Sequence, residues 1–280
     1  MQGRHGHFLR SRRFFDFKLA DEYDRNGENT VASSPDMYIY PVLITTIVAV
    51  TIFCSVMSLV FAALLRRPDD TVHRVARFWG NAILFLSGVR VRVEGLENIP
   101  RGIPVIFMSN HQGNYDIFTL LGRIPVQFRW IAKKEVFAIP LLGPAMKKAG
   151  YISIDRQDRA RAIGSMDEAA AKIRQGNSVM TFPEGTRSPD GVIRPFKKGS
   201  FYLAIQSGVP IVPVTILGSR EVMKKRKLGI RPGTITVVID KPVDVKEYTL
   251  ENREDLIEKI HRVVTGNYRK YKEQGGAVLH

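Results

Sequence analysis

Residues 38–65 form an uncharged, mostly apolar run, YIYPVLITTIVAVTIFCSVMSLVFAALL, which restricts the chain more than any other feature. It exceeds the roughly 18 uncharged apolar residues that indicate a membrane helix. A signal peptide is a poorer fit, because the run is too long and no small-residue cleavage site follows it. A helix buried in a soluble core rarely runs this far without charge. Arg66 and Arg67 end the run and Arg74 and Arg77 follow, which favours a cytoplasmic location for that side.

The segments on either side of this run differ in character. Residues 1–36 mix acidic and basic side chains with weak apolar periodicity, so we predict a disordered leader or, alternatively, a translation start at Met37. Residues 78–89 are apolar but too short to span a membrane, and they contain Trp79. Aromatic and basic residues beside an apolar face are typical of the membrane interface. We therefore predict a membrane-associated helical hairpin over residues 37–89.

From residue 90 onward, strand-like runs alternate with helix-like ones. The segment VRVRVEG alternates as an edge strand does, and further strands are expected at residues 104–108, 128–132, 151–154, 178–182, 211–217 and 235–239. Helices are expected near residues 117–121, 141–148, 159–174, 199–206 and 250–271. This order predicts an α/β fold, a mixed sheet flanked by helices, for residues 90–280.

Charge and missing motifs narrow the function classes. The chain has 42 Lys and Arg against 27 Asp and Glu, a net charge of +15 that favours an anionic partner. It contains no Gly-x-Ser-x-Gly and neither of the two common glycine-rich nucleotide-binding motifs. Cys54 is the single cysteine and the six histidines are scattered, so no metal and no cofactor are expected. No nucleic-acid-binding motif accompanies the charge, so nucleic acid is not expected as a partner.

The segment SNHQGNYD, residues 109–116, follows a buried strand and precedes a helix, where open α/β sheets place their sites. His111 is a candidate general base, and Asp116 can accept its Nδ1 proton and fix its tautomer. No enzyme nucleophile stands beside this pair, so direct acyl transfer to a hydroxyl of the substrate is the simplest reaction. The structural alternative is that Asp116 caps the following helix and the backbone satisfies His111.

Basic residues follow three further predicted strands. Lys133, Arg156 and the segment Glu184-Gly185-Thr186-Arg187 lie at strand ends, which a sheet brings to one rim. Arginine suits bidentate recognition of phosphate, and Gly185 lets backbone N–H groups approach a ligand closely. The alternative for Arg156 is an ordinary surface ion pair with Asp155 or Asp158.

Four segments, NHQGNYD, GYISIDR, FPEGTRS and IVPVTI, occur in this order and resemble the glycerolipid acyltransferases, most closely the 1-acyl-glycerol-3-phosphate (lysophosphatidate) acyltransferases. The resemblance spans roughly residues 70–245 and implies a role for each matching residue: His111 as the base, Asp116 as its charge partner, Arg156, Gly185, Thr186 and Arg187 as binders of the acceptor phosphate, Lys133 as a further phosphate contact, Glu184 as the residue that orders their loop, and Pro213 as a residue that shapes the acyl pocket. The chain has Gly113 where the family often has Ser, and Ser153 where a bulky apolar residue is frequent, so acceptor and acyl preference stay open.

The resemblance implies a membrane-bound enzyme with its catalytic domain on the cytoplasmic face. It would move an acyl group from acyl-CoA or acyl carrier protein to a lysophospholipid acceptor, lysophosphatidate, and yield phosphatidate. An acyltransferase for glycerol-3-phosphate or another lysophospholipid is the nearest alternative. A non-catalytic membrane protein that binds anionic lipid is the alternative from another class.

Overall fold

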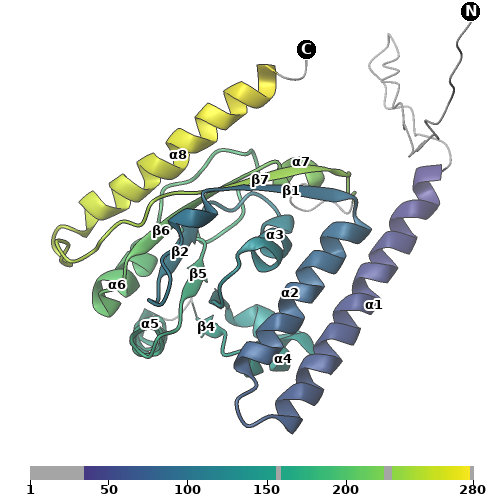
Figure 1. Cartoon of the computed structure of the whole chain (residues 1–280), viewed down its shortest axis with the longest axis horizontal. Coiled ribbons are helices and arrows are strands. Elements are labelled where there is room, and N and C mark those ends of the chain that lie inside the picture. The colour runs from purple at the N-terminus through teal and green to yellow at the C-terminus, as the bar shows by residue number, and fades with distance from the viewer. Residues whose placement is uncertain (1–34, 156–158, 224–228, 278–280) are drawn as a thin grey trace, which may run out of the picture.

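The computed structural model describes residues 35–155, 159–223 and 229–277. All but the end of the predicted leader, residues 1–36, therefore lies outside the described residues, and so does Arg156. The described part is a seven-stranded sheet with helices on both faces (Figure 1). The predicted α/β fold with a mixed sheet is confirmed.

The sheet places several strand ends on one rim. Its order is β1-β7-β6-β2-β5-β3-β4, and every neighbouring pair is parallel except β6 and β7. The carboxyl ends of β2, β5, β3 and β4 consequently point the same way, and β1 lies at the sheet edge as its alternating pattern predicts. The strands are β1 (Val89–Glu94), β2 (Ile106–Ser109), β3 (Arg129–Lys133), β4 (Ile152–Ile154), β5 (Val179–Thr181), β6 (Ile211–Leu217) and β7 (Gly233–Ile239).

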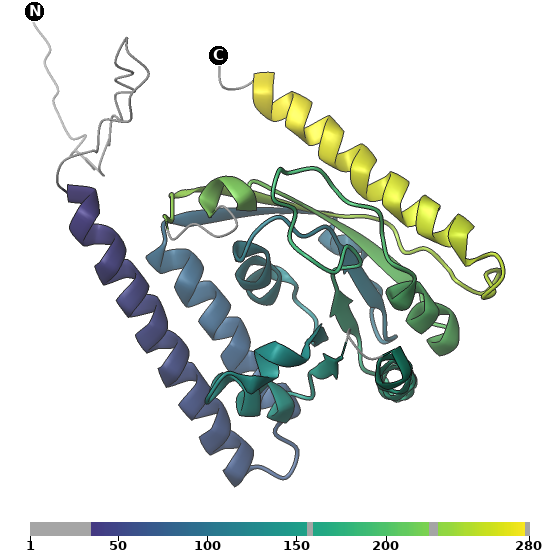
Figure 2. The same ribbon diagram turned by 180° about the vertical axis from the view of Figure 1, so that it is seen from behind.

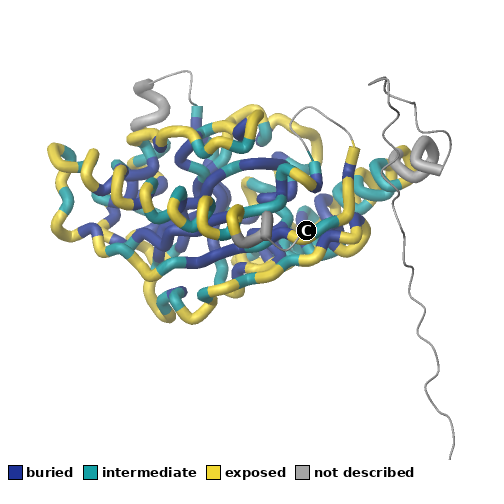
Figure 3. Tube along the Cα trace, turned by 90° about the horizontal axis from the view of Figure 1, so that it is seen from above, coloured by how far each residue is buried: buried dark blue, intermediate teal, exposed yellow. Residues whose placement is uncertain are grey.

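Helices cover the two faces of this sheet and enclose two apolar clusters. Because side chains alternate along a strand, Ile106 and Met108 join one cluster, under α5, α6 and α8, while Phe107 joins the other, with α2 and α3. Buried residues gather in the sheet and exposed ones along the outer helices (Figure 3). The α-helices are α1 (Pro35–Leu64), α2 (Asp69–Leu86), α3 (Tyr115–Arg123), α4 (Leu142–Lys148), α5 (Arg159–Arg174), α6 (Lys198–Ser207), α7 (Ser219–Val222) and α8 (Arg253–Ala277), with short 3₁₀ helices at Leu96–Asn98 and Lys134–Ala138.

The first two helices lie side by side at one end of the molecule (Figure 2). The indole N–H of Trp79 in α2 donates a hydrogen bond to Thr51 Oγ1 in α1 at 2.9 Å. Within α1, Pro41–Leu64 is long and apolar enough to cross a membrane, and only 17% of its most apolar stretch is buried. Helix α2 begins at Asp69, well before the apolar run at 78–89. Its first turns contain charged residues, but Val72 and His73 lie on the buried face and extend it.

Candidate active site

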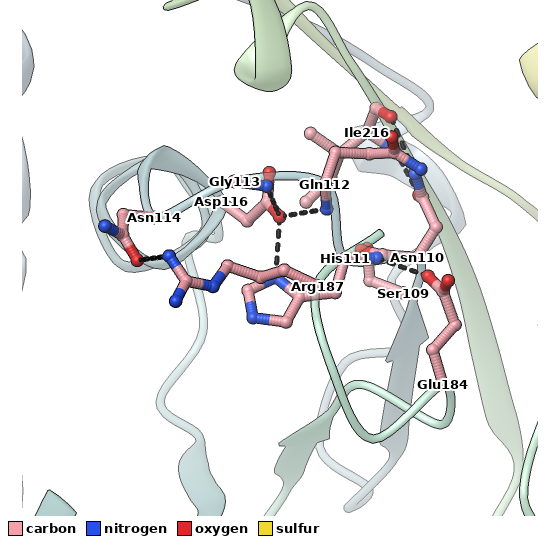
Figure 4. A network of polar contacts seen from close by, with 10 residues as sticks. All are labelled: Ser109, Asn110, His111, Gln112, Gly113, Asn114, Asp116, Glu184, Arg187 and Ile216. Atoms are coloured by element: carbon pink, nitrogen blue, oxygen red, sulfur yellow. Dashed lines mark hydrogen bonds and ion pairs between the residues drawn. The ribbon is translucent and has the colours of Figure 1, made fainter. Parts of the chain in front are cut away.

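The loop between β2 and α3 brings His111 and Asp116 together. His111 Nδ1 lies 2.7 Å from Asp116 Oδ2, and the same oxygen accepts the backbone N–H groups of Gln112 at 2.7 Å and Gly113 at 2.9 Å (Figure 4). Asp116 is fully buried in the first turn of α3, so these three donors replace the water that its Oδ2 has lost.

This contact fixes the chemistry of the imidazole. A carboxylate only accepts hydrogen bonds, so the bond to Asp116 requires the proton on His111 Nδ1. That tautomer leaves the lone pair of Nε2 available to take a proton from a substrate. The His111 side chain is 14% exposed and lines a cavity, so the ring is sheltered and reachable. In this geometry the imidazole is able to accept a proton at Nε2 while Asp116 holds the ring.

Glu184, in the loop after β5, holds the backbone of the His111 loop. Its Oε1 accepts the N–H of His111 at 2.6 Å, and its Oε2 accepts the N–H of Arg194 at 2.9 Å. The N–H of Ser188 donates to the carbonyl of His111 at 2.8 Å. Because Glu184 is buried and both of its oxygens accept backbone N–H groups, it orders the backbone around His111.

The burial of Glu184 gives stability a pH dependence. Burial raises the pKa of Glu184 from 4.5 to about 7; the N–H groups of Arg194 and His111 lower this pKa, and Asp116 raises it. The folded-state pKa lies above the ordinary value, so this contribution to stability is full below pH 4.5 and is lost as the pH rises through 7. Glu184→Gln removes the titration. We expect the parent to lose on the order of 1–3 kcal/mol more unfolding free energy than the variant over this range.

Thermal unfolding of parent and variant in detergent micelles, from acidic to mildly alkaline pH, checks this difference. The variant's amide keeps only one acceptor oxygen, so a constant loss of stability at every pH is also expected. Two stability curves that run parallel across the whole range would show that Glu184 does not titrate there.

Two further residues of the loop, Asn110 and Gly113, were not predicted as functional. Asn110 is fully buried: its side-chain amide donates to the carbonyl of Ile216 at 2.8 Å, and its Oδ1 accepts the N–H of Ile216 at 2.7 Å. This pairing ties the loop to β6 as a strand would. A Cβ at Gly113 would lie 2.9 Å from the carbonyl oxygen of Ser219. The close approach of α7 explains why glycine stands where the family often has serine.

The predicted phosphate ligands lie around His111 as far as the structure describes them. Arg187 Nη1 donates to Asn114 Oδ1 at 2.5 Å, so an asparagine that sequence reasoning missed aims this guanidinium (Figure 4). Lys133, at the exposed end of β3, lines the same cavity as His111. Gly185 and Thr186 also line it. An asparagine three residues after the histidine of the candidate His–Asp pair is the only signal that the sequence offers for Asn114.

The cavity itself joins polar and apolar walls. It measures about 400 Å³, within the range of small-molecule sites, and it reaches from His111 and the loop 185–187 toward α1, α2 and α4. Its apolar end is lined by residues that include Val72, Val75, Ala76, Leu142, Ala145 and Met146.

Pro213 does not belong to this wall. It lies within β6 between Val212 and Val214, and both of these valines face the cluster with α2 and α3. Alternation therefore turns Pro213 to the opposite face of the sheet, and it is not among the residues that line the cavity. An acyl pocket in this cavity is consequently shaped by the helices rather than by Pro213.

Comparison with known proteins gives consistent matches. A family model described as Acyltransferase matches residues 90–217. The chain is 38% identical over 189 residues to the 1-acyl-sn-glycerol-3-phosphate acyltransferase of Limnanthes douglasii, covering 67% of this chain and 66% of that protein, just under two thirds of its length. It is 36% identical to the chloroplastic relative BAT2 of Brassica napus but spans only 50% of that protein.

Two further matches extend over most of this chain and most of the protein compared with it. The chain is 30% identical over 225 residues to 1-acyl-sn-glycerol-3-phosphate acyltransferase alpha of Homo sapiens, covering 80% of this chain and 79% of that protein. The crystal structure of the 1-acyl-sn-glycerophosphate (LPA) acyltransferase PlsC from Thermotoga maritima superimposes with a TM-score of 0.74 at 29% identity, covering 85% of this chain and 96% of that one. The resemblance that four sequence motifs indicate is thus confirmed, and the chain belongs to the acyltransferase family that includes the 1-acyl-sn-glycerol-3-phosphate acyltransferases.

Proposed function

We propose that this chain is a membrane-associated 1-acylglycerol-3-phosphate O-acyltransferase. It transfers a fatty acyl group from an acyl thioester, acyl-CoA or acyl carrier protein, to the free hydroxyl of lysophosphatidate and yields phosphatidate. The observation that carries the proposal is that one cavity contains the histidine of a His–Asp pair, a loop with Arg187, and an apolar wall.

In the proposed reaction, His111 Nε2 removes the proton of the acceptor hydroxyl while the oxygen attacks the thioester carbonyl. The tetrahedral intermediate collapses, its C–S bond breaks, and the imidazolium returns the proton to the leaving thiolate. Asp116 stabilises the imidazolium and holds the ring. No acyl-enzyme forms, because the nucleophile belongs to the acceptor.

In this proposal, the loop 185–187 binds the phosphate of the acceptor. Gly185 has a left-handed backbone (φ 74°) and closes a turn with its N–H on the carbonyl of Phe182, which exposes the chain at the cavity. Arg187 contributes a fork of N–H donors that matches a phosphate. Anchoring the phosphate beside His111 would hold the free hydroxyl near Nε2, and such positioning lowers a barrier by several kcal/mol. Lys133 and Arg156 remain proposed as additional cations.

The exposed apolar surface supports a membrane location. Helix α1 carries a row of exposed apolar side chains, and α2 adds two exposed phenylalanines, Phe78 and Phe85. The exposed residues of α1 are Val42, Val48, Ile52, Phe53, Val56, Val60 and Leu64. Contiguous apolar surface of this extent indicates contact with lipid or another protein. Arg66 and Arg67 stand at the adjoining turn and Arg74 follows within α2, so we place the catalytic domain on the cytoplasmic face. Residues 37–89 then act as the membrane hairpin and residues 90–280 as the catalytic domain.

The test is acyl transfer by the full chain in membranes or detergent. Lysophosphatidate is supplied with acyl-CoA and, separately, with acyl carrier protein thioester, and phosphatidate is measured. Glycerol-3-phosphate and uncharged or zwitterionic lysolipids serve as competing acceptors. Phosphatidate formed in preference to the other products, with no acid-stable acyl-protein in a single turnover, is the expected result. Preference for another acceptor would replace the substrate, and no product from any acceptor would leave a lipid-binding protein.

A further inference from the structure

The ring of Phe182 lies flat against the imidazole of His111. The two ring centroids are 3.9 Å apart and the ring planes differ by only 7°. Phe182 directly follows β5, is half-buried and lines the cavity beside His111. Neither the charge pattern nor the His–Asp spacing points to this phenylalanine, and the chemistry described above does not use it.

The stack supplies a constraint that the carboxylate alone does not. The hydrogen bond between Nδ1 and Asp116 holds one atom of the imidazole, but small combined rotations about Cα–Cβ and Cβ–Cγ still let the ring swing out of its plane. The Nε2 lone pair lies in the plane of the ring, so such a swing turns it away from a substrate hydroxyl. A flat partner at 3.9 Å removes this freedom, because rotation would drive the imidazole edge into the phenyl face.

Phe182 is itself held in place. Trp130 lies on it with ring centroids 5.4 Å apart at 29°, and Phe128 packs edge-on against Trp130 at 5.4 Å. Trp130 and Phe128 are both buried in the core. On the backbone side, the carbonyl of Phe182 accepts the N–H of Gly185, and the carbonyl of Pro183 accepts the N–H of Lys197. The catalytic ring therefore rests on a rigid aromatic row rather than on a movable side chain.

We propose that Phe182 is a positioning residue for acyl transfer: its ring fixes the plane of the His111 imidazole so that Nε2 points into the cavity. The inference rests on the proposed function, in which His111 is the base. If Phe182 only lined the cavity, it would contribute to binding the apolar parts of the substrate, and its replacement would change KM. A residue that aims the base acts on the chemical step and changes kcat.

Three substitutions separate these roles. Phe182→Leu keeps an apolar side chain but removes the flat face, and kcat for phosphatidate formation should fall about 10- to 100-fold while KM for lysophosphatidate and for the donor stays within about twofold. Phe182→Tyr and Phe182→Trp keep a flat ring and should hold kcat within about threefold of the parent. Phe201→Leu is the matched control: it removes a buried aromatic ring from the other apolar cluster, away from the cavity, should lower the melting temperature, and should leave kcat unchanged.

A second readout does not depend on turnover. In the full chain in detergent micelles with labelled histidine, the ring protons of His111 should show an upfield ring-current shift in the parent and in Phe182→Tyr, and that shift should vanish in Phe182→Leu. If the parent makes no phosphatidate, the proposed function fails, and the His111 resonance still decides whether Phe182 places the imidazole. Parental kcat in Phe182→Leu, a change confined to KM, equal losses in all three variants, or an unshifted His111 signal in the parent each overturns the inference.

Discussion

Replacing His111 by alanine is expected to lower the rate of phosphatidate formation by about 10²–10⁴-fold, the range that a general base contributes. The loss should appear in kcat, because the proposed phosphate contacts at the loop 185–187 remain and continue to bind lysophosphatidate. Initial rates with saturating donor and acceptor, in micelles that contain the full chain, measure it. His261→Ala is a suitable control, since His261, in α8, packs against Phe196 with ring centroids 4.9 Å apart and does not line the cavity.

Asp116 should prove to act through His111. Asp116→Asn presents an amide to Nδ1, favours the wrong tautomer, and should lower kcat by about 10²-fold or more. The double variant His111→Ala with Asp116→Asn should be no slower than His111→Ala alone, because the carboxylate has no ring left to orient. Full activity in His111→Ala would remove the proposed mechanism, and additive losses in the double variant would give Asp116 a separate role.

The elements that sequence reasoning places best are those with a single strong pattern. Helix α5 spans the predicted 159–174, because Ala170 and Ile173 recur on one face of an amphipathic repeat. Strand β6 spans the predicted 211–217, a continuous run of β-branched and apolar residues that is buried on both faces. The rim that carries the site could be predicted for the same reason, since His111 and the loop 185–187 both directly follow buried apolar strands.

What the sequence does not predict depends on contacts between distant segments. The stack of Phe182 on His111 joins two loops, and the pairing of Asn110 with Ile216 joins a loop to a strand far along the chain. Pro213 was expected at the acyl pocket because its segment resembles a family motif, but only the three-dimensional alternation along β6 shows which face of the sheet it occupies. Local patterns carry no information about such partners.

Arg187→Ala is expected to lower kcat/KM for lysophosphatidate by about 10²–10³-fold, since two charge-assisted hydrogen bonds to phosphate are worth several kcal/mol together. The side chain already lies at the cavity, with Nη1 bound to Asn114 at 2.5 Å. Arg187→Lys keeps the charge but loses the planar fork, so it should recover only part of this loss.

The discriminating comparison is between two acceptors, lysophosphatidate and 1-monoacylglycerol, which lacks the phosphate. The parent should prefer lysophosphatidate strongly, and Arg187→Ala should abolish that preference while changing the slow acylation of monoacylglycerol by less than about threefold. Arg194→Ala is the matched control: it removes a cation from the same loop whose guanidinium pairs with Asp190 at 2.6 Å, and it should keep the preference. If Arg187→Ala slowed both acceptors equally, Arg187 would act by holding Asn114 and the His111 loop, and the phosphate would have to be bound elsewhere on the basic rim.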